Sequence, residues 1–129
     1  MTKALTGIDI IEVRRIEEAI GNLGDNFLNK IFTENEIAYC SKSQKMKYQH
    51  FAARFAAKEA VFKALSNEIK SREDLVWKQI EVVNEESGRP KINIDLLNTL
   101  NISKNIESID ISLSHIAEFA VASVVVILK

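Results

Sequence analysis

The fold of this chain can be approached from one run of residues, QHFAARFAAKEAVFKAL, at positions 49–65. The run is rich in alanine and contains neither glycine nor proline, which favours a helix. Phe51, Phe55, Phe62 and Leu65 fall within a narrow arc at 3.6 residues per turn. We therefore predict one long helix, from about residue 44 to residue 65.

The charged residues of this helix lie close to its apolar arc. Lys58 falls inside the arc, Arg54 borders it on one side, and Glu59 borders it on the other, with Lys63 one turn further on. Long side chains in such positions can run along a core and present their charged ends at a protein edge or cleft. A solvated Glu59–Lys63 pair with surface cations would explain the same pattern without any function.

Length and composition predict a single globular domain over residues 1–129, with 27% charged and 47% apolar residues. Cys40 is the single cysteine, so neither an intrachain disulfide nor a cysteine zinc site is expected. The first residues contain no apolar signal region, and no apolar run is long enough to span a membrane. A cytoplasmic protein without a membrane partner is the expectation.

The net charge of −1 conceals an uneven distribution. Six basic residues lie between positions 42 and 63, namely Lys42, Lys45, Lys47, Arg54, Lys58 and Lys63. Glu59 is the one acidic residue in that segment, so the segment is strongly positive while the rest of the chain is acidic. This pattern indicates an anionic ligand bound at one place. Nucleic acid is not expected, because proteins that bind polyanions are usually basic overall.

Before the long helix, residues 4–11 form an apolar, β-branched run that predicts a strand. Alternation places Ile8 and Ile10 on one face and Gly7, Asp9 and Ile11 on the other. A carboxylate between isoleucines needs an ion pair, backbone N–H donors or a metal ion, and the sequence leaves all three open. Residues 12–20 predict an amphipathic helix, and Thr33 to Glu36 form a capping box that starts a helix ending near Cys40.

After the long helix, the pattern changes from helical to strand-like. Residues 71–74 could form a short turn, and residues 77–84 and 91–94 predict a hairpin around Gly88-Arg89-Pro90. A short helix is expected at 95–100, a strand at 106–114, and a last, nearly continuous apolar strand at 118–128, central in a sheet or at an interface. The predicted class is α+β, with helices packed on a mostly antiparallel sheet.

The chemistry available to this chain is that of oxygen and positive charge. It contains no GxxxxGK[ST] phosphate loop, no HExxH and no CxxC pair. Asp9 and Glu59 would come together if the long helix packs on the first strand, and two carboxylates can hold Mg²⁺ together with substrate phosphates. Arg54, Lys58 and Lys63 would then neutralise a diphosphate or polyphosphate.

Two further features allow an ordinary structural explanation. His115 follows Ser112-Leu113-Ser114 at the end of an alternating strand, where a histidine often does no more than cap or face solvent. Gly88-Arg89-Pro90 is what a plain hairpin turn would contain. From the residues alone, neither feature identifies a site.

Three segments together resemble the motifs of the 4′-phosphopantetheinyl transferases. They are Gly7-Ile8-Asp9 followed by Arg15, then Arg54-Phe55-Ala56-Ala57-Lys58-Glu59-Ala60 followed by Lys63, and finally Ser112-Leu113-Ser114-His115. Their order, their spacing and the chain length are similar to those of the short subgroup, the holo-[acyl-carrier-protein] synthases. The resemblance spans essentially the whole chain.

The resemblance implies transfer of 4′-phosphopantetheine from coenzyme A to a serine of an apo acyl carrier protein, releasing adenosine 3′,5′-bisphosphate, in fatty acid biosynthesis. It implies that Asp9 and Glu59 bind Mg²⁺ at the coenzyme A pyrophosphate, with Lys63 beside the same phosphates. Arg54 and His115 would contact the phosphates of the nucleotide, with Lys58 also on the coenzyme A side. Gly88-Arg89-Pro90 would lie near the adenosine, and Arg15 with Arg14 would meet the carrier protein.

The resemblance also implies a homotrimer with sites at subunit interfaces, so that each subunit contributes half a site. The chain departs from the family pattern at Ser66-Asn67, where many members have glycines, and at Ile116, where a polar residue is common. Altered nucleotide affinity is expected from these differences.

Two other functions remain open from the sequence. A non-catalytic module could bind nucleotides, coenzyme A or acidic partners through the basic segment at 42–63. A small RNA-binding protein could use the same segment, although the acidic remainder argues against it.

Overall fold

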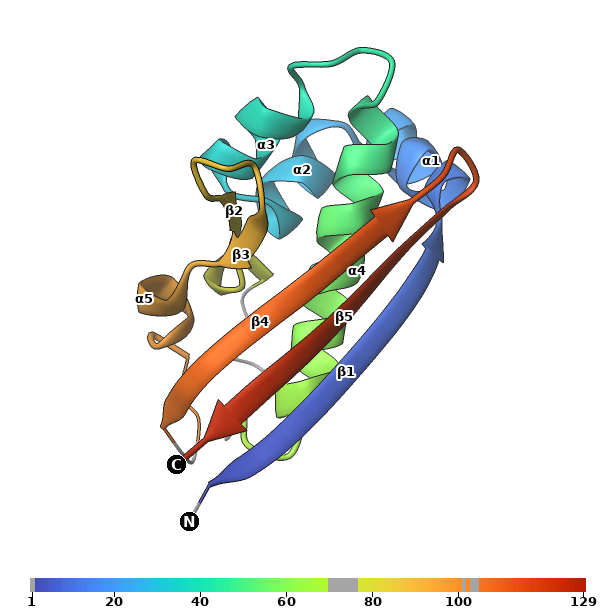
Figure 1. Cartoon of the computed structure of the whole chain (residues 1–129). Coiled ribbons are helices and arrows are strands. Elements are labelled where there is room, and N and C mark those ends of the chain that lie inside the picture. The colour runs from blue at the N-terminus through green and yellow to red at the C-terminus, as the bar shows by residue number, and fades with distance from the viewer. Residues whose placement is uncertain (1, 70–76, 101, 103–104) are drawn as a thin grey trace.

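A computed structural model describes residues 2–69, 77–100, 102 and 105–129. The elements, in chain order, are β1 (Lys3–Glu12), α1 (Val13–Leu23), α2 (Asp25–Ile31), α3 (Glu34–Cys40), α4 (Lys47–Leu65), a 3₁₀ turn (Trp77–Gln79), β2 (Val82–Asn84), β3 (Pro90–Ile92), α5 (Ile94–Leu97), β4 (Ile106–His115) and β5 (Phe119–Leu128). Figure 1 shows α4 lying across one face of a sheet, with the three shorter helices α1, α2 and α3 gathered around one end of it. The predicted α+β class is confirmed.

The main sheet is antiparallel and has the strand order β1-β5-β4. The last strand, β5, is therefore central, as its continuous apolar run predicts. Asp9 lies opposite Ala122 and Ile8 lies opposite Ser123 in the β1–β5 register. The predicted alternation in β1 is confirmed, since Ile8 and Ile10 face outward and are 64% and 65% exposed.

Helix α4 packs closely against the inner face of β1 at Gly7. A Cβ added at this glycine would overlap the backbone oxygen of Ala60, so the contact between β1 and α4 depends on having no side chain there. The predicted long helix is confirmed, but burial extends well beyond the apolar arc that its large side chains form. Buried residues surround most of the helix, because the sheet, α1, α3 and β2 all contact it. Its alanines allow these approaches from several sides.

The helices near the start of the chain follow local capping rules. The predicted capping box of α3 is confirmed: Thr33 Oγ1 accepts the backbone N–H of Glu36 at 3.2 Å, and Glu36 Oε1 accepts the backbone N–H of Thr33 at 2.9 Å. Helix α1 continues past Gly21 and ends only at Gly24, whose φ of 57° stops it. A single glycine inside a helix weakens it without ending it.

The region of the predicted hairpin differs from the expectation. Residues 77–79 form a 3₁₀ turn, and the strands are restricted to Val82–Asn84 and Pro90–Ile92. The carbonyl oxygens of Trp77 and Ile80 accept hydrogen bonds from Lys58 instead of a neighbouring strand. The short helix begins at Ile94, capped by Asn93, one residue before the predicted start. The turn expected at 71–74 lies outside the described residues.

The outer face of the main sheet is not covered by any described element. Ile8 and Ile10 of β1 and Phe119 and Val125 of β5 are large apolar residues exposed on this face. The inner face, in contrast, is sealed by α4 (Figure 1). Within the described part of the chain, no helix is long and apolar enough to cross a membrane.

Candidate active site

Asp9 and Lys63 form a direct ion pair between β1 and α4. Lys63 Nζ lies 2.9 Å from Asp9 Oδ1 and donates a second hydrogen bond, also 2.9 Å long, to the backbone oxygen of Ile8. The Asp9 side chain is 15% exposed, whereas that of Lys63 is 52% exposed. The Asp9 carboxylate was expected to need a compensating positive charge, and Lys63 supplies it. The exposed side of Lys63 is open to solvent. The predicted approach of strand and helix at Asp9 is confirmed.

Glu59 faces the same space from α4 and is less well compensated. Among the described residues, none donates a hydrogen bond to its carboxylate. Burial raises the pKa of Glu59, the negative charge of Asp9 raises it further, and Lys63 partly opposes the shift. Two neighbouring carboxylates, one without a partner, are a donor set that suits Mg²⁺ when substrate oxygens complete the shell. No group of three or more acidic, histidine or cysteine ligands occurs among the described residues.

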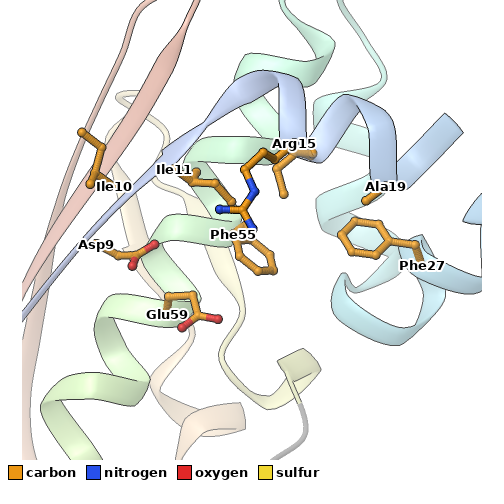
Figure 2. Close-up of a pocket in the computed structure, with 9 residues that line it drawn as sticks. Asp9, Ile10, Ile11, Arg15, Ala19, Phe27, Phe55 and Glu59 are labelled. Carbon is orange, nitrogen blue, oxygen red and sulfur yellow. The ribbon is translucent and has the colours of Figure 1, made fainter. Parts of the chain in front are cut away.

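Asp9 and Glu59 lie at one end of a cavity of about 390 Å³. Figure 2 shows the two carboxylates beside each other, with the guanidinium of Arg15 further along the same cavity near Phe55. Ile11, Ile16, Ala19, Phe27 and Phe55 supply apolar walls. The cavity therefore joins an anionic, cation-binding end to an apolar end edged by one arginine.

Arg54 and His115 lie in a second cavity, of about 180 Å³, which shares no residue with the first. Arg54 is 3% exposed, and its Nη2 donates to Asn84 Oδ1 at 2.6 Å. Its guanidinium carbon lies 4.0 Å from the centre of the Tyr39 ring. Gly88 and Pro90 line the same cavity, so the predicted turn does reach this site. A φ of 92° at Gly88 places it in the conformation that favours glycine.

Both histidines of the chain meet at the second cavity. Their ring centroids are 5.6 Å apart in an edge-on arrangement, and His115 Nδ1 lies 2.8 Å from Gln49 Oε1. Burial lowers the pKa of His50, and the nearby His115 and Arg54 lower it further. His50 Nδ1 and Arg54 Nε are buried and have no hydrogen-bond partner among the described residues.

Three predicted site residues lie elsewhere. Lys58 is fully buried, and its Nζ bonds to Glu36 Oε1 at 2.8 Å and to the backbone oxygens of Trp77 and Ile80 at 3.0 and 2.7 Å. The expectation that its charged end reaches an edge or cleft is wrong, because α3 and the segment at 77–80 cover it and Glu36 compensates its charge.

The other two arginines are exposed and paired. Arg89 forms an ion pair with Asp110 at 3.2 Å rather than lining the second cavity with its neighbours Gly88 and Pro90. Arg14 lies within 3.7 Å of Glu12 and 3.6 Å of Glu18, while Arg15 lines the first cavity. The structure thus brings Arg15, but not Arg14, next to Asp9 and Glu59.

Several lining residues were not predicted from the sequence. Tyr39, Gln49, His50 and Asn84 belong to the second cavity or support it, and Phe27 belongs to the first. They come from α2, α3, α4 and β2, and no motif marks them. For His50 the sequence did offer one signal: the chain contains only two histidines, and the fold brings their rings together. Cys40 is fully buried, and burial raises its pKa to about 12, which makes the thiol unreactive.

A paired carboxylate site with an adjoining lysine, together with a separate arginine and histidine cavity, defines a small α+β protein equipped for a phosphate-bearing ligand. The comparison with known families is more specific. Residues 6–124 match the family model described as the 4′-phosphopantetheinyl transferase superfamily. The chain belongs to this superfamily.

Relatives of known function match over nearly their full length. A holo-[acyl-carrier-protein] synthase of Ruminiclostridium cellulolyticum is 42% identical, covering 95% of this chain and 90% of that protein. One from Thermodesulfovibrio yellowstonii is 44% identical, covering 93% and 95%. Among solved structures, the Helicobacter pylori holo-[acyl-carrier-protein] synthase in complex with coenzyme A is 31% identical, with a TM-score of 0.75 and coverage of 95% and 99%. The fold expected from the motifs is thereby confirmed.

Proposed function

We propose that this protein is a holo-[acyl-carrier-protein] synthase, which transfers 4′-phosphopantetheine from coenzyme A to a serine of apo acyl carrier protein and releases adenosine 3′,5′-bisphosphate. The near full-length similarity to synthases is the observation that carries the proposal. The paired carboxylates of Asp9 and Glu59 beside Lys63 support it, because this arrangement suits a pyrophosphate with its counter-ion.

In the proposed reaction, Asp9 and Glu59 would hold Mg²⁺, which when bound supplies positive charge beside the pyrophosphate oxygens. Lys63 has its exposed side available for the same phosphates and would stabilise the leaving bisphosphate. The carrier serine hydroxyl attacks the phosphorus next to the pantetheine, and the bond from that phosphorus to the bisphosphate breaks. A carboxylate at this end of the cavity, such as that of Glu59, would take the hydroxyl proton.

The second cavity would receive the nucleotide part of coenzyme A. Arg54 and His115 would bind a phosphate there, and Gly88 and Pro90 would lie beside the adenosine. Arg89 would reach the ligand only by leaving Asp110, and Lys58 would act from within the core by holding α4 against the segment at 77–80.

The carrier protein would approach along α1. Arg15 lies at the first cavity, where an acidic carrier helix could reach it, and Arg14 could exchange its exposed ion pairs for the same partner. An approach along α1 would deliver the serine to the end of the cavity that holds Asp9 and Glu59.

The active form is proposed to be a homotrimer with sites at the subunit interfaces. Two observations support this: the exposed apolar outer face of the sheet, and the separation of the proposed ligand residues into two cavities with no shared residue. A coenzyme A molecule bridging the first cavity of one subunit and the second cavity of another would use both.

The deciding experiment is intact-protein mass spectrometry of apo acyl carrier protein after incubation with this protein, coenzyme A and Mg²⁺. A mass gain of one phosphopantetheine, absent when EDTA is added and absent with Asp9→Ala, is expected. If several carrier proteins gain no mass while coenzyme A still binds, the protein is a binding module and the proposed transfer is wrong.

A further inference from the structure

The second cavity has a charge pattern that favours an anion. Among the described residues that line it, Arg54, His50 and His115 can carry positive charge, and none is aspartate or glutamate. Arg54 is only 3% exposed, and its buried Nε has no hydrogen-bond partner among the described residues. An unsatisfied guanidinium N–H in a buried position is a strong donor for a ligand oxygen.

Gln49 determines how His115 can take part in binding a phosphate at the second cavity. The atom that faces His115 Nδ1, at 2.8 Å, is the amide oxygen of Gln49, which can only accept a hydrogen bond. With the Gln49 amide in this orientation, the tautomer that satisfies both groups has its proton on Nδ1, which leaves a lone pair on Nε2 of the neutral ring. A lone pair repels phosphate oxygens. His115 becomes a donor from Nε2 only after it gains a second proton.

His50 does not replace His115 in this role. Its ring stands edge-on to His115 and lies 5.5 Å from the ring of Tyr39 on α3. Its pKa is lowered by burial and by the adjacent His115 and Arg54, which disfavours the charged form of the ring. The groups facing the two histidines are Tyr39 from α3, Arg54 and Gln49 from α4, and Asn84, Gly88 and Pro90 from the hairpin; Arg54 is the charged one.

We propose that Gln49 is a positioning residue that fixes the proton of His115 on Nδ1, so that this cavity binds a phosphomonoester together with one additional proton. This inference rests on the proposed function, which supplies the ligand as a phosphate of coenzyme A. Phosphate affinity at this cavity then decreases as pH rises, because each unit of pH makes the required proton tenfold scarcer.

The inference can be tested by calorimetric titration with adenosine 3′,5′-bisphosphate in the presence of Mg²⁺. Titration at one pH in two buffers of different ionisation enthalpy, Tris and HEPES, measures the protons taken up on binding. Work between pH 7 and 8.5 keeps the ligand phosphates as dianions, since their second pKa is about 6. The wild-type protein is expected to take up about one proton at pH 7.5 and to bind about tenfold more weakly at pH 8.5 than at pH 7.5.

Gln49→Leu separates positioning from a general structural role. Without the amide oxygen, His115 can place its single proton on Nε2 and donate while neutral. Proton uptake should then fall close to zero, and the change in affinity over the same pH range should shrink to about twofold or less. Gln79→Leu is the matched control, because Gln79 donates to Thr99 Oγ1 at 2.7 Å outside both cavities. It should leave proton uptake unchanged.

Two histidine variants locate the proton. His115→Asn should abolish the uptake, and His50→Asn should retain it. Uptake in Gln49→Leu equal to that of the wild type, or uptake lost in His50→Asn and kept in His115→Asn, would overturn the inference. Binding without proton uptake, in a protein that still modifies its carrier, overturns the inference alone. Failure of adenosine 3′,5′-bisphosphate to bind at any pH overturns the proposed function as well.

Discussion

Single residues in this protein carry charge into places where charge is unfavourable, and Glu59 is the clearest instance. Its raised pKa means that the folded protein keeps a proton on Glu59 at pH values where the unfolded chain has released it. Stability therefore falls as pH rises through the interval between the unfolded and the folded pKa, and it remains lower above that interval. The carboxylate is retained at the expense of stability.

Glu59→Gln should consequently stabilise the fold while abolishing transfer. We expect an increase in Tm of about 2–4 °C at pH 7 in EDTA, as measured by calorimetry. The gain should shrink as pH falls toward the ordinary carboxyl range near ~4.3, where Glu59 is neutral in both states. Glu17→Gln, on the exposed side of α1, is the control and should change Tm little. A gain equal at pH 4 and pH 7 would contradict the proposed cause.

Lys58 is the opposite case, since its buried charge is fully compensated. Burial lowers its pKa and Glu36 counteracts the shift. Lys58→Met would leave Glu36 charged in the core, and the expected loss is about 3–5 kcal/mol in the free energy of unfolding by urea. Lys58→Met combined with Glu36→Gln should recover part of that loss. Arg14→Met, which breaks only exposed pairs, should cost less than about 0.5 kcal/mol. If Lys58→Met and Arg14→Met lower the free energy of unfolding by similar amounts, the buried pair of Lys58 and Glu36 stabilises the fold no more than an exposed pair does.

At the scale of elements, the contact between β1 and α4 sets the distance between Asp9 and Glu59. Gly7→Ala inserts a methyl group into the backbone of Ala60 and must push the strand away from the helix. We expect a loss of about 3 kcal/mol in the free energy of unfolding and a sharply reduced rate of carrier modification, measured by mass spectrometry. Gly21→Ala is the matched control.

The control position, Gly21, has free space where an added methyl group would go, whereas Gly7 has none. Gly21 is inside α1, and a Cβ there meets nothing within 4 Å. Gly21→Ala should therefore stabilise the protein by about 0.5–1 kcal/mol without affecting activity. If both alanine variants behave alike, the close approach at Gly7 does not control the site.

The elements themselves show what a sequence can and cannot predict. β1, α3, β4 and β5 follow local rules of alternation and capping, so their positions were predictable, as was the meeting of Asp9 with the helix. The strand predicted at 77–84 failed because Lys58, distant in sequence, takes the carbonyl oxygens of Trp77 and Ile80. The second cavity gathers residues from α3, α4, β2, β3 and β4, and no local pattern encodes such a meeting.

At the scale of the whole molecule, the uncovered face of the sheet is the surface through which the proposed trimer would assemble. Ile8 is 64% exposed on this face, in the middle of the edge strand β1. Ile8→Glu should convert the proposed trimer into single chains, as measured by light scattering after size-exclusion chromatography, because an unpaired carboxylate is costly to bury. Leu23→Glu changes another exposed apolar residue, 57% exposed and at the end of α1, and should leave the mass unchanged. A protein of one-chain mass before any substitution would refute the trimer.

The position of β5 at the centre of the sheet has a consequence for how the protein is made. Lys3 pairs with Leu128, so β1 cannot find its partner until nearly all of the described chain has been synthesised. At typical rates of translation, β1 waits on the order of ten seconds, with the backbone groups that pair with β5 still unpaired. Contacts this distant in sequence also slow the folding step itself. The strand that carries Asp9, although made first, is thus among the last elements of the described fold to be paired.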